Sequence, residues 1–73
     1  MEQLKEMLES KYPNIDFNAE KALVDDGILD SLAVVDIISM IEEAFDVSVT
    51  MEYIQPPYFN SLEAMWEMIE ELQ

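Results

Sequence analysis

The chain has 73 residues, enough for one small domain with a thin core, because a domain of this size buries only about 60% of the surface that its unfolded chain exposes. Apolar residues make up 51% of the sequence, so the chain should fold in spite of a net charge of -14. Its 17 acidic residues face only three lysines, a balance that argues against nucleic acid and anionic membranes as partners and favours basic protein surfaces.

Other absences narrow the class of protein further. The chain has no Cys, which excludes a disulfide scaffold and a thiolate metal site and is compatible with a reducing compartment. It has no apolar run near the roughly 20 residues that span a bilayer, and it does not open as a signal peptide would. We expect a single domain over residues 1–73, located in the cytoplasm and not inserted in a membrane. The acidity alone would also be explained by a need for solubility.

The first predicted element is a short helix over residues 2–11. Leu4, Met7 and Leu8 recur at helical spacing, and Pro13 follows where the helix must stop. Residues 13–29 carry Pro, Asn, Asp and the single Gly, with scattered apolar residues but no sustained period. This pattern indicates a long ordered connection that packs over the core, a feature that is often functional.

The longest predicted helix covers residues 31–45, with Asp30 as its N-cap and neither Gly nor Pro inside it. At about 100° per residue, one side of this helix is apolar and is expected to be core. The residues of that side are Val34, Ile37, Ile41, Ala44 and Phe45. The opposite side carries Asp36, Ser39, Glu42, Glu43 and Asp46.

The last part of the chain predicts a turn and a helix. Residues 51–54 allow one helical turn, which Pro56 and Pro57 end, so a third helix is brief if present. Asn60 and Glu63 have the spacing of a capping box. The apolar stripe of the last helix then consists of Leu62, Met65, Trp66, Ile69 and Leu72. This order of elements predicts an all-α fold, a small four-helix bundle with a long loop between its first two helices.

The sequence lacks the side chains on which most enzymes depend. Without His or Cys it has no usual base near neutral pH, no catalytic thiol, no imidazole ligand and no serine triad. The acidic residues before Gly27 fail the EF-hand spacing, since the first calcium ligand would fall on Ala22. We therefore predict neither an enzyme nor a metal protein. A hydrolase with two catalytic carboxylates is the enzyme alternative, and it would need a cleft.

Residues 27–32, with the sequence Gly-Ile-Leu-Asp-Ser-Leu, carry the strongest signal. They resemble the acyl carrier protein family, in which the serine of an Asp-Ser-Leu motif at the start of the second helix is the pantetheine attachment site. The similarity continues through Asp36, through Ile-Glu-Glu at 41–43 and through Phe-Asp-Val at 45–47, and the helix order fits almost the whole chain.

This resemblance implies a carrier whose Ser31 holds a covalent 4'-phosphopantetheine arm, taken from coenzyme A, with an acyl or aminoacyl group as a thioester. Asp30 belongs to the motif and caps the helix. The chemistry of the position agrees, because a serine at the first turn is exposed beside unpaired N–H groups at the positive end of the helix dipole. The alternative is that Ser31 or Asp30 serves only as an N-cap.

A second interpretation comes from the helix face opposite the core. Leu32 and Val35 fall among its carboxylates, which predicts a docking stripe: the apolar pair enters a partner's pocket, and the acids meet Lys or Arg at its rim. The predicted docking stripe consists of Leu32, Val35, Asp36, Ser39, Glu42 and Glu43. In the resembled family, partner enzymes read this helix. The alternative is that the long loop or the short helix covers the two apolar residues.

Within the family, the sequence is more similar to D-alanyl carriers and stand-alone aminoacyl carriers than to fatty-acid carriers. Ala33 and Val34 follow the motif where fatty-acid carriers usually have a polar residue, and residues 27–31, 45–49 and 59–61 resemble the aminoacyl group. Leu32 is a departure, because D-alanyl carriers commonly have Phe there, and the paired prolines are another.

The partners implied by the resemblance are a phosphopantetheinyl transferase, an acyl- or aminoacyl-activating ligase and a downstream acyltransferase or synthase. We expect a monomer that meets them transiently through small interfaces. An unmodified acidic adaptor, which binds a basic enzyme through the helix at 31–45, is the alternative from another functional class.

Overall fold

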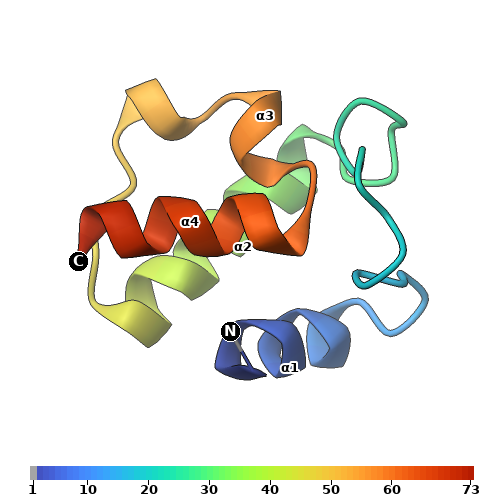
Figure 1. Ribbon diagram of the computed structural model, residues 1–73, viewed down its shortest axis with the longest axis horizontal. Coiled ribbons are helices and arrows are strands. Elements are labelled where there is room, and N and C mark those ends of the chain that lie inside the picture. Colours follow the sequence, from blue (N-terminus) through green and yellow to red (C-terminus); the bar gives the residue numbers. More distant parts are fainter. Residues whose placement is uncertain (1) are drawn as a thin grey trace.

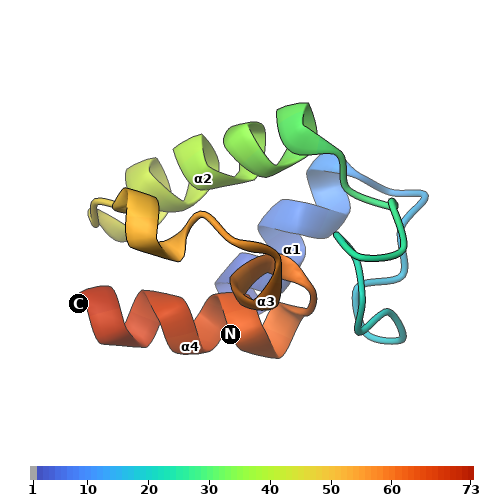
Figure 2. The ribbon, with the colours of Figure 1, turned by 90° about the horizontal axis from the view of Figure 1, so that it is seen from above.

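The computed structural model describes residues 2–73, and within them it contains helices and no strands. The elements are α1 (Glu2–Lys11), α2 (Ser31–Phe45), the 3-10 helix η1 (Met51–Tyr53), α3 (Pro56–Phe59) and α4 (Leu62–Leu72). Figure 2 shows α2 and α4 on opposite sides of the molecule with α1 and α3 between them, and the long connection closes one end (Figure 1). The predicted all-α fold, a small four-helix bundle, is confirmed.

One apolar core joins the four α-helices to the long connection. Its buried residues are Leu4, Leu8, Phe17, Leu23, Leu29, Ile37, Ile38, Ile41, Val49, Phe59, Leu62, Met65, Met68 and Ile69. Phe17 and Leu23 are fully buried, which confirms that the connection packs over the core. The buried faces of α2 and α4 differ from the prediction. Ile38 and Met68 are also buried, whereas Val34, Ala44, Phe45, Trp66 and Leu72 are only partly buried.

Both ends of α2 are set by aspartates. The Asp30 carboxylate accepts a hydrogen bond from the Ala33 N–H at 2.8 Å, so the predicted N-cap is confirmed. At the other end Asp46 has a φ of 53°, in the left-handed region where many helices stop.

The prediction for the paired prolines was incomplete. The turn at η1 does form, but Pro56 and Pro57 also begin a helix, α3, which is too short to show an apolar period. The first N–H groups of a helix have no partner within it, so proline loses nothing there and its fixed φ favours the helix.

The predicted capping box at Asn60 was wrong. The N-cap of α4 is Ser61, whose hydroxyl accepts a hydrogen bond from the Ala64 N–H at 3.1 Å. The Asn60 side chain turns instead to the long connection, where it accepts from the N–H groups of Val24 and Asp25 at 3.0 and 3.1 Å. The Asn60 oxygen thus accepts two hydrogen bonds from backbone N–H groups of the connection, whereas as an N-cap it would accept one.

Candidate functional site

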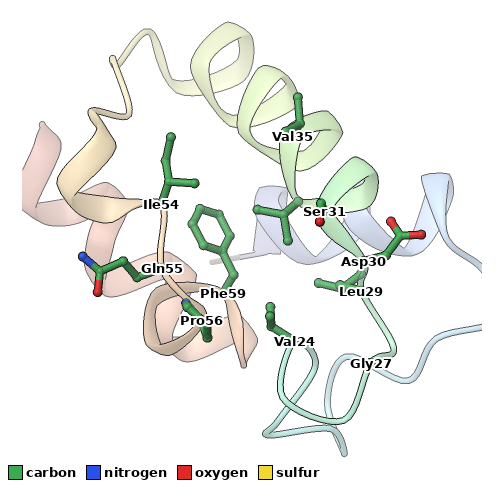
Figure 3. Close-up of a pocket in the computed structure, with 11 residues that line it drawn as sticks. Val24, Gly27, Leu29, Asp30, Ser31, Val35, Ile54, Gln55, Pro56 and Phe59 are labelled. Carbon is green, nitrogen blue, oxygen red and sulfur yellow. The ribbon is translucent and has the colours of Figure 1, made fainter.

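Ser31 is the first residue of α2, and it is exposed. Asp30 fixes this position, because its carboxylate caps the first turn while its carbonyl accepts from the Val34 N–H at 3.0 Å. The structure therefore places the hydroxyl of Ser31 at the solvent-facing head of the helix, as the sequence predicted. Figure 3 shows this hydroxyl beside a pocket, with the Asp30 carboxylate directed away from Phe59.

The backbone around Ser31 suits an anion. The N–H groups of Ser31 and Leu32 have no protein acceptor within residues 2–73, and the first turn of α2 has no acidic side chain. Unpaired N–H groups and the positive end of the helix dipole both favour a phosphate at such a position.

The pocket beside Ser31 has a volume of about 480 Å³ and three walls. The long connection, the head of α2 and the segment that leads into α3 each form one wall. The lining residues are Val24, Gly27, Leu29, Asp30, Ser31, Val34, Val35, Ile54, Gln55, Pro56 and Phe59. Most of the lining is apolar, and Figure 3 shows Phe59 at its centre with Ile54 and Val35 on opposite sides. Such a surface accepts the apolar parts of a molecule whose charged end lies at Ser31.

Gly27 shapes the approach to the site. Its φ is 75°, a conformation that residues with a side chain adopt only with strain, and no atom lies within 4 Å of the position a Cβ would take. The glycine is therefore needed for the turn of the backbone and not for space.

The structure places the two apolar residues of the predicted docking stripe in solvent. Leu32 is 80% exposed and Val35 58% exposed, so neither the loop nor the short helix covers them. Large apolar side chains exposed elsewhere in residues 2–73 are Ile28, Met51 and Ile54. Ile54 shares the pocket with Val35. The exposure of Met51 and Ile54 was not predicted, although two apolar residues in a turn before prolines were a usable signal.

The polar residues of the predicted stripe divide into two kinds. Ser39 and Glu43 are exposed. Asp36 accepts a hydrogen bond from the Tyr12 hydroxyl at 2.9 Å and lies 3.7 Å from the Lys11 ammonium, while Glu42 accepts from the Val49 N–H at 2.9 Å. Asp36 and Glu42 thus also hold neighbouring segments against α2, which the helical wheel could not show.

Tyr12 and Glu63, which lie outside the pocket, have shifted pKa values. Burial, and then the hydrogen bond to Asp36, raise the pKa of Tyr12 above its ordinary 10.0. The hydrogen bond from Lys21 lowers the pKa of Glu63. These two residues form an ion pair that joins the long connection to α4. At neutral pH the phenol of Tyr12 is therefore a hydrogen-bond donor to α2.

A sequence model of the family described as phosphopantetheine attachment site matches residues 2–65. The chain belongs to this family. It is a carrier domain and not an enzyme, and its prosthetic group is 4'-phosphopantetheine. Carrier domains work with phosphopantetheinyl transferases and with synthases or ligases. Comparison with curated proteins gave no significant match, and comparison with solved structures gave none either.

The residues of the carrier domain fit this group. An exposed hydroxyl, two N–H groups without a protein acceptor and an apolar pocket lie together at the head of α2. Across residues 2–73, no helix has the length and apolar character needed to span a bilayer. The same residues contain no cluster of His, Cys, Asp or Glu suited to hold a metal ion.

Proposed function

We propose that Ser31 carries the 4'-phosphopantetheine arm and that the chain presents an acyl or aminoacyl group, held as a thioester on this arm, to partner enzymes in the cytoplasm. The observation that carries the proposal is the exposed Ser31 hydroxyl at the first position of α2, within the matched residues 2–65 and beside the apolar pocket. The prosthetic group supplies the thiol that binds the cargo.

The chain's own residues position the attachment without catalysing it. Asp30 holds the first turn of α2, so that the Ser31 hydroxyl stays in solvent where a transferase reaches it. In the transfer, the serine oxygen would give its proton to a base of the transferase and bond to the phosphorus that bears the pantetheine. The pyrophosphate bond of coenzyme A would break, and adenosine 3',5'-bisphosphate would leave. The N–H groups of Ser31 and Leu32 then face the new anion.

The test is attachment of the arm in vitro. After incubation with a phosphopantetheinyl transferase and coenzyme A, the intact mass of the wild type should rise by one arm, and the mass of Ser31→Ala should not change. Ser48→Ala is the matched control, because this serine is exposed and lies outside both the motif and the predicted docking stripe. An arm on the Ser31→Ala variant, or none on the wild type under conditions that load another carrier, would refute the proposal.

We further propose a small aminoacyl cargo, such as D-alanine, over a long fatty acyl chain. The resemblance of residues 27–31, 45–49 and 59–61 to aminoacyl carriers supports this choice. The packing of the interior also supports this choice, because Phe17, Phe59 and Met65 fill the core and the pocket opens at the surface.

Side-chain NMR spectra of the loaded protein test the cargo. An alanyl thioester should leave the signals of Ile37, Ile41 and Met65 unchanged, because the cargo stays outside the core. An octanoyl thioester serves as the comparison. Large shifts of these core signals with octanoyl would show that the interior admits an acyl chain and would overturn the preference for a small cargo.

The predicted docking stripe completes the proposed function. A partner enzyme places Leu32 and Val35 in an apolar depression, and its basic residues meet Glu43 and the remaining acids of α2. The exposure of the two apolar residues supports this part of the proposal.

A further inference from the structure

Asn60 joins two segments that are far apart in the sequence. Its side-chain oxygen accepts from the N–H groups of Val24 and Asp25 at 3.0 and 3.1 Å, and its amide group donates to the Asp25 carboxylate at 3.0 Å. Its backbone carbonyl accepts from the Leu23 N–H at 2.9 Å. One residue between α3 and α4 therefore satisfies the donors of an entire turn of the long connection.

That turn forms a wall of the pocket beside Ser31. Val24 lines the pocket directly, the Gly27 N–H donates to the Val24 carbonyl at 3.0 Å, and the Leu29 N–H donates to the Leu23 carbonyl at 2.8 Å. Leu29 is buried and leads straight into Asp30 and Ser31. A continuous set of hydrogen bonds thus runs from Asn60 to the backbone that enters α2.

An ion pair also joins the connection to α4, but it is a weaker interaction than the hydrogen bonds of Asn60. Lys21 and Glu63 form an ion pair at 2.7 Å, but both side chains are more than half exposed. Exposed ion pairs contribute little in water and are screened by salt. The hydrogen bonds of Asn60 are therefore the principal polar hold on this wall.

We propose that Asn60 is a positioning residue of the carrier site: it holds the turn at residues 23–25, and through it the approach to Ser31, in the conformation that the transferase accepts. This inference rests on the proposed attachment at Ser31. Without Asn60, the turn samples other conformations, and the binding-competent form becomes a fraction of the population. The apparent affinity for the transferase falls by that fraction, while the chemical step at the hydroxyl is unchanged.

Steady-state transfer kinetics, with the carrier as the varied substrate, provide the first test. Asn60→Ala should raise KM about fivefold or more and leave kcat within about twofold. Ser61→Ala is the matched control, because it removes the cap of α4 at the next residue without touching the turn. It should leave KM within about twofold. Both variants are first shown by circular dichroism to be folded at the assay temperature. Equal effects of the two substitutions would overturn the proposal, since only general stability would then be involved.

Exchanging the side chains of Asn60 and Asp25 provides a second test, because it should restore their hydrogen bonds. Asn60→Asp keeps the oxygen that accepts from Val24 and Asp25 but sets a carboxylate against the Asp25 carboxylate, so its KM should lie between those of the wild type and Asn60→Ala. The double variant Asn60→Asp with Asp25→Asn restores a donor and an acceptor in reversed order. Its KM should return to within about twofold of the wild type. A double variant no better than Asn60→Asp would contradict the role of these hydrogen bonds.

Amide exchange separates a failure of this inference from a failure of the proposed function. In the unmodified protein, Asn60→Ala should speed hydrogen exchange at Val24 and Asp25 by about tenfold or more and shift the amide signals of Leu29 and Ser31, whereas Ser61→Ala should not. If the wild type takes no arm, attachment at Ser31 is refuted and the exchange data alone decide the role of Asn60. Unchanged signals at Ser31 would overturn it even in a protein that loads normally.

Discussion

Among the described residues, Asp46 is the one non-glycine residue with a left-handed backbone conformation. It ends α2 with a φ of 53°, where a residue with a Cβ is strained, and its carboxylate lies at the negative end of the helix dipole. Glycine is the common residue at such a position because it adopts this conformation freely.

Asp46→Gly should therefore stabilise the protein. We expect the free energy of unfolding to rise by about 0.5–1 kcal/mol, the gain at the helix end being partly offset by the greater freedom of glycine in the unfolded chain. Urea denaturation measures the change. Asp46→Asn separates the causes, because it removes the charge and retains the Cβ. A decrease in stability on Asp46→Gly would contradict this account of the helix end.

Ser31 and Asn60 differ in how far their structural positions followed from the sequence. The sequence placed Ser31 correctly, because its exposure depends only on the local signals that start a helix, with Asp30 as the cap. It misplaced Asn60, because the same residue that fits a capping box also satisfies backbone donors 35 and 36 residues away. A local motif does not reveal a distant competitor for the same side chain.

At the scale of elements, α2 has one buried face and one exposed face. Ile37 and Ile41 are fully buried on one face, and Leu32 is 80% exposed on the other. Burial in the core and the exposure that the proposed docking requires are thus separated on a single helix, so that substitutions on the two faces have different expected effects.

Leu32→Ala should impair docking and leave the fold intact. The free energy of unfolding should stay within about 0.5 kcal/mol of the wild type, since the side chain is mostly in solvent. Transfer of the arm or cargo by a partner should slow about tenfold, as expected when an apolar anchor is lost. Ile37→Ala is the control on the buried face and should cost about 2–5 kcal/mol of stability. Denaturation and transfer kinetics measure both effects, and undiminished transfer by Leu32→Ala would exclude this anchor.

The contact between Tyr12, which directly follows α1, and α2 should be sensitive to alkaline pH. Tyr12 donates to Asp36, and its pKa is raised, first by burial and then by this hydrogen bond. A raised pKa in the folded state gives stability that is fully present below the unfolded value of 10.0 and is lost as the pH rises through the folded value. Tyr12→Phe removes this dependence. The difference in unfolding free energy between the wild type and Tyr12→Phe should shrink above about pH 10, and a constant difference up to pH 11 would contradict it.

Helix positions were more predictable than the short elements between them. The bounds of α1 and α2 agree with the structure, because Pro13 follows the end of the first helix and Asp30 caps the start of the second. The four residues of α3 are too few to show a period, and its two prolines act as helix breakers or helix starters according to the turn that precedes them. The helical wheel of α2 likewise predicted the outward face, but it could not predict the hydrogen bonds that Asp36 and Glu42 accept from Tyr12 and Val49.

At the scale of the whole molecule, charge is the dominant feature. The chain carries a net charge of -14 on a body of 27 × 23 × 19 Å. Within residues 2–73, ion pairs form only between Lys11 and Asp36 and between Lys21 and Glu63. The screening length is about 30 Å at 0.01 M salt and about 8 Å at 0.15 M, so at low salt each acid is repelled by all the others.

Moderate salt should therefore stabilise the carrier domain. Raising sodium chloride from about 0.01 to 0.15 M should raise Tm by about 4–8 °C, which corresponds to roughly 1 kcal/mol for a domain of this size. The same change should slow association with a basic partner, because it weakens electrostatic steering. Thermal melts and stopped-flow binding measure the opposite trends. A Tm that falls with salt would mean that the two ion pairs outweigh the repulsion.

The two ends of α2 also fix the geometry of any tether. In both ribbon views the C-terminal end of α4 lies at the same end of the molecule as the last turn of α2, far from the first turn of α2 (Figures 1 and 2). A linker joined after Gln73, whether to an affinity tag, a sensor surface or another protein, leaves from the end opposite the serine. Immobilisation through that point keeps the hydroxyl turned toward the bulk solution.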